Sequence, residues 1–528
     1  MKDLDAFKDF LQCVLDSVAQ SSCKGAGWER GEEARKKYRR IAELGQEEDF
    51  YDFIETNCGN DREVQLTALQ YMYGLTGFTE PYIEFLKVRL KQEFSGQEDL
   101  FLELNLQDQL ISNLFCLGKN LSFRDEWETN EKIARRMQEW FAFSYEKIHK
   151  EERQRDFVVV MVSQLLGIIH SPTRLVLEFC RIIQKYLKKR VLIVSNVLKA
   201  DLELLSQAGV FGRIFNVNYR EERGFFKIKY RDESFDGYQL LFEKDNVREI
   251  KQFIDKIYRL KPFCVWNMAS EPALAVVMKQ FTDSVYMWMS QGYPPVNADL
   301  IVNYIPVWEE KDKKNKEFLI QNNIKVLETE FLFPYNKPCG TVKRSDIGIP
   351  EDAFCIGIIG TRIGSECTDA FLQIIDEAVS RDKEIFVLFL GFLDDVILEF
   401  EKRLRDYKNL FERHTSVGAR ADLIESLRLL DIFVNPPRIG GGNTGAMAMS
   451  IGIPVISLKA GDIAAVAGEE FTAETLSDYP ELILKYKNDI GFYEKQSRLA
   501  EDRILEKTTD DEKLAAIIQK IFDRIEQA

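Results

Sequence analysis

The stretch Asp431-Ile-Phe-Val-Asn-Pro-Pro-Arg-Ile-Gly-Gly-Gly-Asn-Thr-Gly-Ala-Met-Ala-Met-Ser-Ile-Gly-Ile-Pro-Val-Ile-Ser457 decides the fold of this chain. It begins with a short apolar run that is typical of a buried strand, passes through three consecutive glycines, and continues with small residues that suit a tightly packed helix. A second apolar run, Pro454 to Leu458, follows. This order predicts a βαβ unit, in which free backbone amides at the helix N-terminus make a seat for a phosphate group.

Five residues of this stretch are candidates for binding a phosphate: Gly441, Gly442, Asn443, Thr444 and Gly445. The glycines leave the backbone uncovered, and the side chains of Asn443 and Thr444 can cap the following helix. A tight turn that needs glycine only for its backbone angles is the simpler alternative. The stretch lacks the lysine of a Walker loop and the spacing of a dinucleotide-binding fingerprint, so it matches neither motif.

Other short apolar runs predict two sets of parallel strands, with helical segments between them. The expected strands are 157–162, 190–194, 263–266, 285–289 and 300–304 in the first set, and 354–359, 385–390, 431–435 and 454–458 in the second. A β-rich insertion at residues 213–242 is expected to be antiparallel. The fold class is therefore α/β with two sheets, and a ligand is expected beyond the carboxyl ends of the strands, between the two domains.

The first part of the chain has a different pattern, because its apolar residues recur every three or four positions. Residues 1–152 are therefore expected to form an all-helical N-terminal domain. The charged run at 150–156 marks the boundary to the first α/β domain, at 153–340. A turn-rich stretch at 334–350 leads into the second, at 341–528.

Composition narrows the classes of protein that this chain can be. Its 528 residues carry a net charge of −15, which repels nucleic-acid backbones, so no nucleic-acid partner is expected. Nine scattered cysteines and three histidines indicate reduced thiols rather than disulfides or a zinc site. The most apolar stretch, 157–169, is shorter than the roughly 20 residues that span a bilayer, and the N-terminus lacks a secretory pattern. These features predict a cytoplasmic protein without a membrane span.

Gly442-Asn-Thr-Gly445, Gly452-Ile-Pro454 and the segment 458–467 resemble the C-terminal domain of GT-B glycosyltransferases. Within that superfamily they are most similar to the O-GlcNAc transferase group and its bacterial adhesin-glycosylating relatives. The resemblance covers about residues 156 to 528. It implies a GT-B fold, with two Rossmann-like domains facing a cleft, and a donor diphosphate held at residues 441–445.

The resemblance also implies cations near the diphosphate. Arg362 follows a predicted strand at a junction where the family carries a lysine, and a guanidinium can clamp two phosphate oxygens. Arg420 matches a second family lysine in charge. A surface arginine with no ligand is the alternative for Arg362. The chain departs from the family pattern at Met447, where the ribose-binding acid would fall, and at Ile439, one of two places where many retaining enzymes have a glutamate.

In the first α/β domain, His170-Ser-Pro-Thr173 is similar to a histidine-containing segment of the same family at the same junction. His170 is the candidate catalytic base, because the pKa of a histidine lies near the working pH. A histidine that only bonds backbone is the alternative. Asn267 and Gln291 end strands of the same layer and are weaker candidates for the acceptor or sugar side.

Together, these residues predict a glycosyltransferase that moves a sugar from a nucleoside diphosphate donor, a UDP-sugar by resemblance, to an acceptor. The expected mechanism inverts the anomeric centre and uses neither a metal nor another cofactor. The only Asp-x-Asp motif, Asp3-Leu-Asp5, lies in the helical region. By the same resemblance, a protein such as a surface adhesin is the candidate acceptor. The alternatives are a non-catalytic partner or chaperone subunit of a glycosyltransferase complex, and a nucleotide-sugar epimerase.

Overall fold

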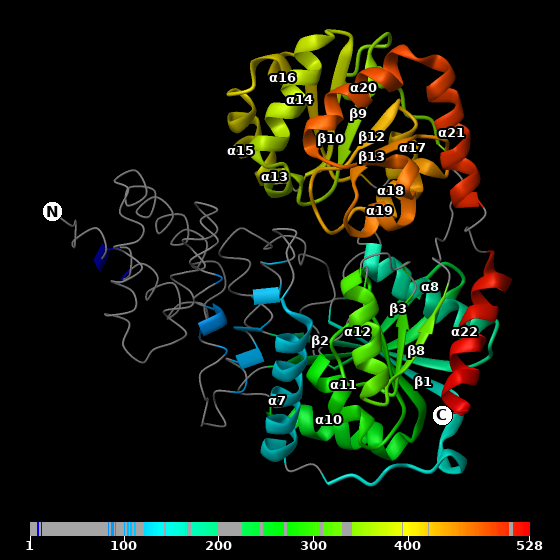
Figure 1. Ribbon diagram of the computed structural model, residues 1–528. Helices are drawn as coiled ribbons and strands as arrows, with labels where there is room; N and C mark the ends of the chain where they lie inside the picture. Colours follow the sequence, from blue (N-terminus) through cyan, green and yellow to red (C-terminus); the bar gives the residue numbers. More distant parts are fainter. Residues whose placement is uncertain are drawn as a thin grey trace.

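A computed structural model describes most of the chain from residue 121 onward (Figure 1). The described ranges are 121–141, 144–163, 165, 171–198, 224–242, 247–268, 272–290, 292–303, 305, 310–329, 340–392, 394–420, 422–505 and 510–527. Single residues between positions 8 and 114 are also described, and all of these are helical, as predicted. Among the described helices, none combines the length and apolar character that crossing a bilayer requires.

The first sheet has eight strands in the order β3-β4-β2-β1-β5-β6-β7-β8. Every neighbouring pair is parallel except β3 and β4, which form an antiparallel hairpin at one edge. The strands are β1 (Gln154–Val162), β2 (Arg190–Leu198), β3 (Gly224–Tyr230), β4 (Glu233–Phe242), β5 (Pro262–Met268), β6 (Ser284–Met287), β7 (Leu300–Asn303) and β8 (Lys325–Glu328).

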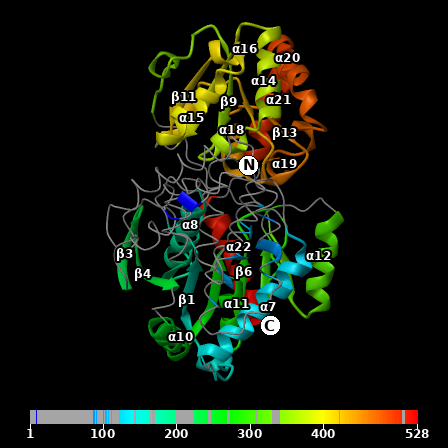
Figure 2. The same ribbon diagram turned by 90° about the vertical axis from the view of Figure 1, so that its left-hand side faces the viewer.

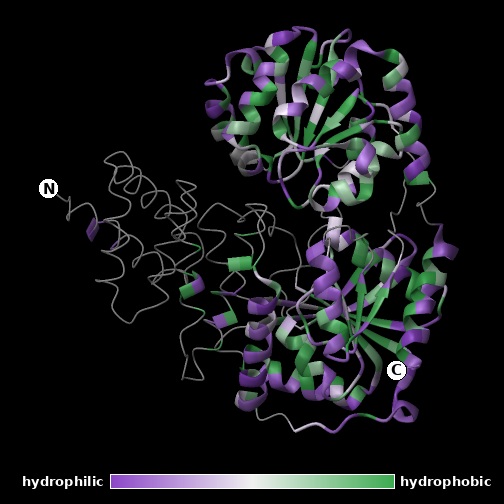
Figure 3. Cartoon of the chain, in the orientation of Figure 1, coloured by the Kyte–Doolittle hydropathy of each residue, from purple (hydrophilic) through white to green (hydrophobic). Residues whose placement is uncertain are grey.

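Helices cover both faces of this sheet because its central strands are apolar on both sides (Figure 3). Val158 and Val160 of β1 belong to one core cluster, whereas Val159 and Met161 between them belong to another. The first cluster includes residues of α8 (Ser171–Lys185), and the second includes residues of the remaining helices of this unit. These helices are α7 (Phe123–Phe141), α10 (Val247–Leu260), α11 (Pro272–Lys279) and α12 (Glu310–Gln321).

The second sheet has six strands, all parallel, in the order β11-β10-β9-β12-β13-β14. The strands are β9 (Phe354–Ile359), β10 (Ile385–Phe392), β11 (His414–Gly418), β12 (Ile432–Val434), β13 (Val455–Leu458) and β14 (Thr472–Ala473). The helices of this unit are α13 (Ile363–Glu366), α14 (Asp369–Arg381), α15 (Asp394–Leu404), α16 (Lys408–Glu412), α17 (Leu423–Leu427), α18 (Gly442–Met449), α19 (Gly461–Ala467), α20 (Tyr479–Asn488) and α21 (Ile490–Leu505). The two units lie one above the other, as the turned view also shows (Figures 1 and 2).

The last helix, α22 (Asp511–Glu526), returns to the first sheet, although it lies within the range predicted for the second domain (Figure 1). It packs against α8, and Ile518 and Phe522 share a core cluster with the first sheet. Arg181 of α8 forms a two-pronged ion pair with Asp511 at the start of α22. The chain therefore crosses twice between the two units.

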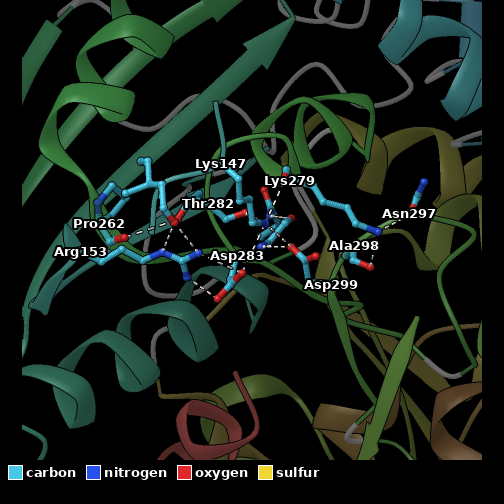
Figure 4. Close-up of polar contacts among 12 residues, drawn as sticks. Lys147, Arg153, Pro262, Lys279, Thr282, Asp283, Asn297, Ala298 and Asp299 are labelled. Atoms are coloured by element: carbon cyan, nitrogen blue, oxygen red, sulfur yellow. Dashed lines mark hydrogen bonds and ion pairs between the residues drawn. The ribbon is translucent and has the colours of Figure 1, made fainter. Parts of the chain in front are cut away.

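A group of charged residues lies at the amino ends of the strands of the first sheet (Figure 4). Asp283 immediately precedes β6, and Asp299 immediately precedes β7. Arg153 forms an ion pair with Asp283, and Lys147 lies 3.4 Å from Asp283 and 3.5 Å from Asp299. Lys147 also donates to the Thr282 carbonyl at 2.8 Å. We call these four charged residues the basal cluster; it attaches the segment before β1 to the sheet.

The strands predicted from apolar runs are present, with ends that differ by a few residues. The antiparallel pairing expected at 213–242 is confirmed for residues 224–242, and residues 213–223 lie outside the described part. Its strand β4 also pairs in parallel with β2, so the hairpin extends the main sheet. The runs did not predict β8, β11 or β14, which are short strands at or next to sheet edges.

Candidate functional site

The glycine-rich stretch forms the turn between β12 and α18, on the side of the second sheet that faces the first unit (Figure 1). Gly441 precedes α18 with φ of +102°, a backbone conformation that favours glycine. A Cβ on Gly442 would lie 3.0 Å from that of Asp462, and one on Gly445 would lie 2.8 Å from the Ile463 side chain. These glycines let α18 pack closely against α19. The first amides of α18 have no carbonyl partner within the helix, and its dipole favours an anion there.

Arg438 fixes the position of this turn through buried hydrogen bonds. The sequence analysis did not include Arg438 among the candidate site residues. Its buried guanidinium donates to Asn435 Oδ1 at 2.8 Å, to Glu366 Oε2 at 2.6 Å and to the Ile359 carbonyl at 2.8 Å. It thereby joins the ends of β9 and β12 to α13. A Cβ on Gly360 would lie 2.4 Å from its Nη1, so the guanidinium occupies the space that a larger residue would need.

Arg362, a predicted phosphate ligand, lies beside this buried group. Its guanidinium is 3.1 Å from Glu366 Oε1, while Arg438 contacts the other oxygen of the same carboxylate. Burial alone would raise the pKa of Glu366, but the charges of Arg438 and Arg362 outweigh it and hold that pKa below its ordinary value. One carboxylate thus faces two guanidinium groups, and the group keeps a net positive charge close to the glycine-rich turn.

Arg420, the other predicted cation, lies after β11 at the far side of the sheet order. Its Nε and Nη2 donate to the two carboxylate oxygens of Asp422, at 2.7 and 2.6 Å. This fork-shaped pairing lowers the pKa of Asp422 and uses the face of the guanidinium that would clamp a phosphate. The role of Arg420 in donor binding remains a prediction.

Among the residues that the structure describes, hydrogen bonds join the two units in front of α18 and α19. Ser290, after β6 in the first unit, donates to Asp462 Oδ1 at 2.9 Å. Arg174, in the first turn of α8, has its Nη2 3.8 Å from the Met447 sulfur of α18. Met447 stands where the family resemblance placed a ribose-binding acid. The carboxyl side of the first sheet therefore meets the glycine-rich turn of the second, as expected for a ligand site between the domains.

The remaining predicted residues are placed as follows. His170 and Gln291 lie outside the described residues. Asn267 is the residue before the last one of β5 and has no exposed surface. Its amide donates to Ser284 Oγ at 3.1 Å and to the Val285 carbonyl at 3.2 Å. A contact with a sugar would require this packing to open. Within the described part of the chain, no group of three or more His, Cys, Asp or Glu side chains could hold a metal ion.

The structure thus brings together the glycine-rich turn, Arg362 and three residues that the sequence analysis missed: Arg438, Arg174 and Asp462. A weak signal existed for Arg438, which is a charged residue between an apolar strand and the glycines. Arg174 follows the His170 segment directly. Neither position showed by local pattern which residue it would contact.

Two α/β units with parallel sheets, facing each other at a glycine-rich turn, define the GT-B fold, as the sequence predicted. No family model matches the chain, and no curated protein matches it in sequence. The chain is similar in structure to a mutant of the O-GlcNAc transferase of Thermobaculum terrenum, with a TM-score of 0.54 and 12% identity over 99% of this chain and 98% of that one. It is also similar to a glycosyltransferase from Rickettsia africae, with a TM-score of 0.50 and 13% identity over 70% of this chain and 99% of that one. These likenesses confirm the fold and its resemblance to the O-GlcNAc transferase group.

Proposed function

We propose that this protein is a glycosyltransferase that takes its sugar from a nucleoside diphosphate donor, with UDP as the nucleotide. The observation that carries the proposal is the glycine-rich turn, which presents the N-terminus of α18 to the opposite unit and has the positively charged Arg362, Arg438 and Glu366 group beside it. A structural neighbour with a similar fold over nearly the whole chain is an O-GlcNAc transferase, which supports the same class of reaction.

In this mechanism the chain stabilises the leaving diphosphate while the acceptor attacks the anomeric carbon. The N–H groups of Gly442, Asn443 and Thr444 would donate hydrogen bonds that stabilise the charge developing on the β-phosphate. The nearby guanidinium groups would add electrostatic stabilisation. A base on the first unit, for which His170 is the candidate, would take the acceptor proton. Attack from the face opposite the leaving group inverts the anomeric centre. A protein acceptor, such as a surface adhesin, belongs to the same proposal.

A second candidate is a non-catalytic partner subunit, and one observation favours it. Arg362 and Arg420 both contact carboxylates of the chain itself, and Met447 offers no carboxylate to a ribose. A subunit of this kind would keep the GT-B fold and the contact between its units without releasing a product. The two candidates differ in turnover rather than in fold.

The test combines ligand binding with turnover for the full-length protein. A panel of nucleotide sugars is added, and both thermal unfolding and the release of free nucleoside diphosphate are measured. We expect one donor to stabilise the protein by about 2.7 kcal/mol at a hundredfold excess over its Kd, and to be slowly hydrolysed. Stabilisation without any release, even with candidate acceptors present, would favour the partner subunit. A folded protein that responds to no donor would contradict the glycosyltransferase.

The variant Gly441→Ala ties this response to the glycine-rich turn. A Cβ there would lie 2.7 Å from Asn435 Oδ1 and 2.9 Å from Arg438 Nη2, so the turn must move. We expect the donor response to be lost. Gly224→Ala is the matched control, because Gly224 also has a positive φ, +96°, but lies in open space at the sheet edge. Equal donor responses in both variants would contradict the assignment of the site.

A further inference from the structure

Arg174 differs from Arg362, Arg438 and Arg420 in the partner that it contacts. Arg362 and Arg438 contact Glu366, and Arg420 contacts Asp422. Arg174 instead donates to the sulfur of Met447, and no hydrogen bond joins it to a carboxylate of the described residues. A thioether is a weak acceptor, whereas a guanidinium has five N–H donors in a fixed fork. Among the described residues, therefore, most of the N–H donors of Arg174 are not used within the chain, and we infer that they can bind a ligand.

The nearest carboxylate on the same helix is already used. Glu178, one turn after Arg174, is buried and accepts a hydrogen bond from Arg181 at 2.8 Å and another from the Tyr230 hydroxyl at 2.8 Å. Arg231 forms an ion pair with it at 2.6 Å. Burial lowers the pKa of Arg174, and the electrostatic effects of Tyr230 and Glu178 offset this only in part. A charged guanidinium that is partly desolvated gains from an incoming anion.

The position of Arg174 relative to α18 identifies what this anion would contact next. Met447 lies three and four residues after Thr444 and Asn443, so the three side chains lie on the same face of α18. Arg174 thus meets this face about one and a half helical turns, or roughly 7.5 Å, from the N-terminus of α18. Arg174 itself lies in the first turn of α8, a 15-residue helix. The Arg174 guanidinium, from the N-terminal turn of α8, therefore lies against the face of α18 that begins at Asn443 and Thr444.

We propose that Arg174 binds the diphosphate of the donor from the first unit, opposite the amides at the N-terminus of α18. This inference rests on the proposed function for the identity of the ligand, and it adds a residue that the family resemblance did not supply. Arg174 and α18 belong to different units, so a diphosphate bound by both would hold the units together. Arg174 acts here as a ligand-binding residue, because its guanidinium would contact the phosphate oxygens.

The experiment measures the Kd of the full-length protein for UDP, uridine and inorganic pyrophosphate by calorimetry. The variants are Arg174→Gln and Arg174→Lys, with Arg190→Gln as the control, because Arg190 is an exposed arginine paired with Asp156 far from α18. We expect Arg174→Gln to weaken UDP binding about 10- to 100-fold and uridine binding less than twofold, as the loss of a charge-assisted contact to phosphate requires. Arg174→Lys should recover part of the affinity. Unfolding curves without ligand check that each variant is folded.

Each outcome separates this inference from the proposed function. If the wild type binds UDP and Arg174→Gln binds it equally well, the inference is overturned while the proposed function stands. A second outcome is that the wild type binds UDP no more tightly than pyrophosphate and that Arg174→Gln loses pyrophosphate binding. The anion site would then stand, and the nucleotide-dependent function would fail. If neither UDP nor pyrophosphate binds to the wild type, both are overturned.

A second pair of variants tests the same inference without changing Arg174. In Met447→Glu a carboxylate would be placed against the guanidinium, where it would pair with it and repel phosphate. We expect UDP affinity to fall about as far as in Arg174→Gln, and the double variant to lose little more. Met447→Leu, which is similar in size and uncharged, should bind UDP as the wild type does. Stronger UDP binding by Met447→Glu would overturn the inference and indicate a ribose contact at this position.

Discussion

The charged side chains at the two ends of the first sheet have different kinds of partner. In the basal cluster at the amino ends of the strands, Arg153 pairs with Asp283, and Lys147 lies near both Asp283 and Asp299 (Figure 4). At the carboxyl side, Arg174 faces a methionine sulfur across the boundary between the units. Charges that satisfy one another hold a fold together, whereas a cation without a carboxylate can bind a ligand. The sheet therefore has a stabilising end and a binding end.

The same contrast holds between two arginines that lie on either side of the boundary between the units. Arg438 is buried and uses its donors on Asn435, Glu366 and the Ile359 carbonyl, so it acts on the shape of the turn. Arg174, by the inference above, binds the ligand in front of that turn. Substitutions at the two arginines should therefore have different effects on stability and on binding.

The largest effect on stability is expected from Asp283→Ala in the basal cluster. The substitution leaves the buried guanidinium of Arg153 without its carboxylate, which should reduce the free energy of unfolding by about 3–5 kcal/mol. UDP affinity should stay within twofold, because the cluster lies at the opposite end of the sheet. Urea unfolding and calorimetry measure the two quantities. Asp156→Ala, which removes an exposed ion pair with Arg190, should cost less than about 1 kcal/mol. Equal losses in the two variants would remove the distinction between the basal cluster and ordinary surface pairs.

A somewhat smaller loss of stability, but with loss of binding, is expected from Arg438→Leu. Glu366 keeps Arg362 as a partner, so the cost should be about 2–3 kcal/mol, near the lower end for breaking a buried pair. The turn before α18 loses its contact with β9, and UDP binding should weaken at least tenfold. Arg438→Lys keeps the charge but not the three-way bonding, so it should recover stability better than affinity. Unchanged UDP affinity in a folded Arg438→Leu protein would contradict the role assigned to Arg438.

The smallest effect concerns the attachment of α22 and depends on pH. The hydrogen bond from Arg181 is the main cause that lowers the pKa of Asp511 below its ordinary value of 3.8. A lowered carboxyl pKa contributes stability that is present above pH 3.8 and is lost as the pH falls through the still lower folded pKa. Because Asp511 is partly exposed, Asp511→Asn should cost about 1 kcal/mol or less at pH 7. The difference from the wild type should shrink below about pH 4. A difference that grows on acidification would show that another group is responsible.

The sequence was informative wherever a feature is local. Continuous apolar runs predicted the central strands of both sheets, and the three glycines predicted the turn before α18. The resemblance at 442–445 and 452–454 identified the fold. Strand β11 was missed because all its residues are only half-buried, so no apolar run marks it. The edge strand β8 was missed for a similar reason.

The contacts that define the site could not be predicted, because they join distant parts of the chain. Arg174 and Met447 are 273 positions apart, and Arg438 and Glu366 are 72 apart. The sequence shows that Arg362 is a cation next to a strand, but not that Glu366 lies against it together with a second arginine. Charge pairing of this kind depends on the packing of whole elements, which local patterns do not report.

A crystal structure of the wild-type protein with UDP tests the central claim most directly. We predict density for the diphosphate between the amides of Gly442 to Thr444 and the guanidinium of Arg174, with a phosphate oxygen within hydrogen-bonding distance of each. A diphosphate bound elsewhere, or one that contacts α18 while Arg174 stays on Met447, would contradict the assignment of the binding end of the sheet.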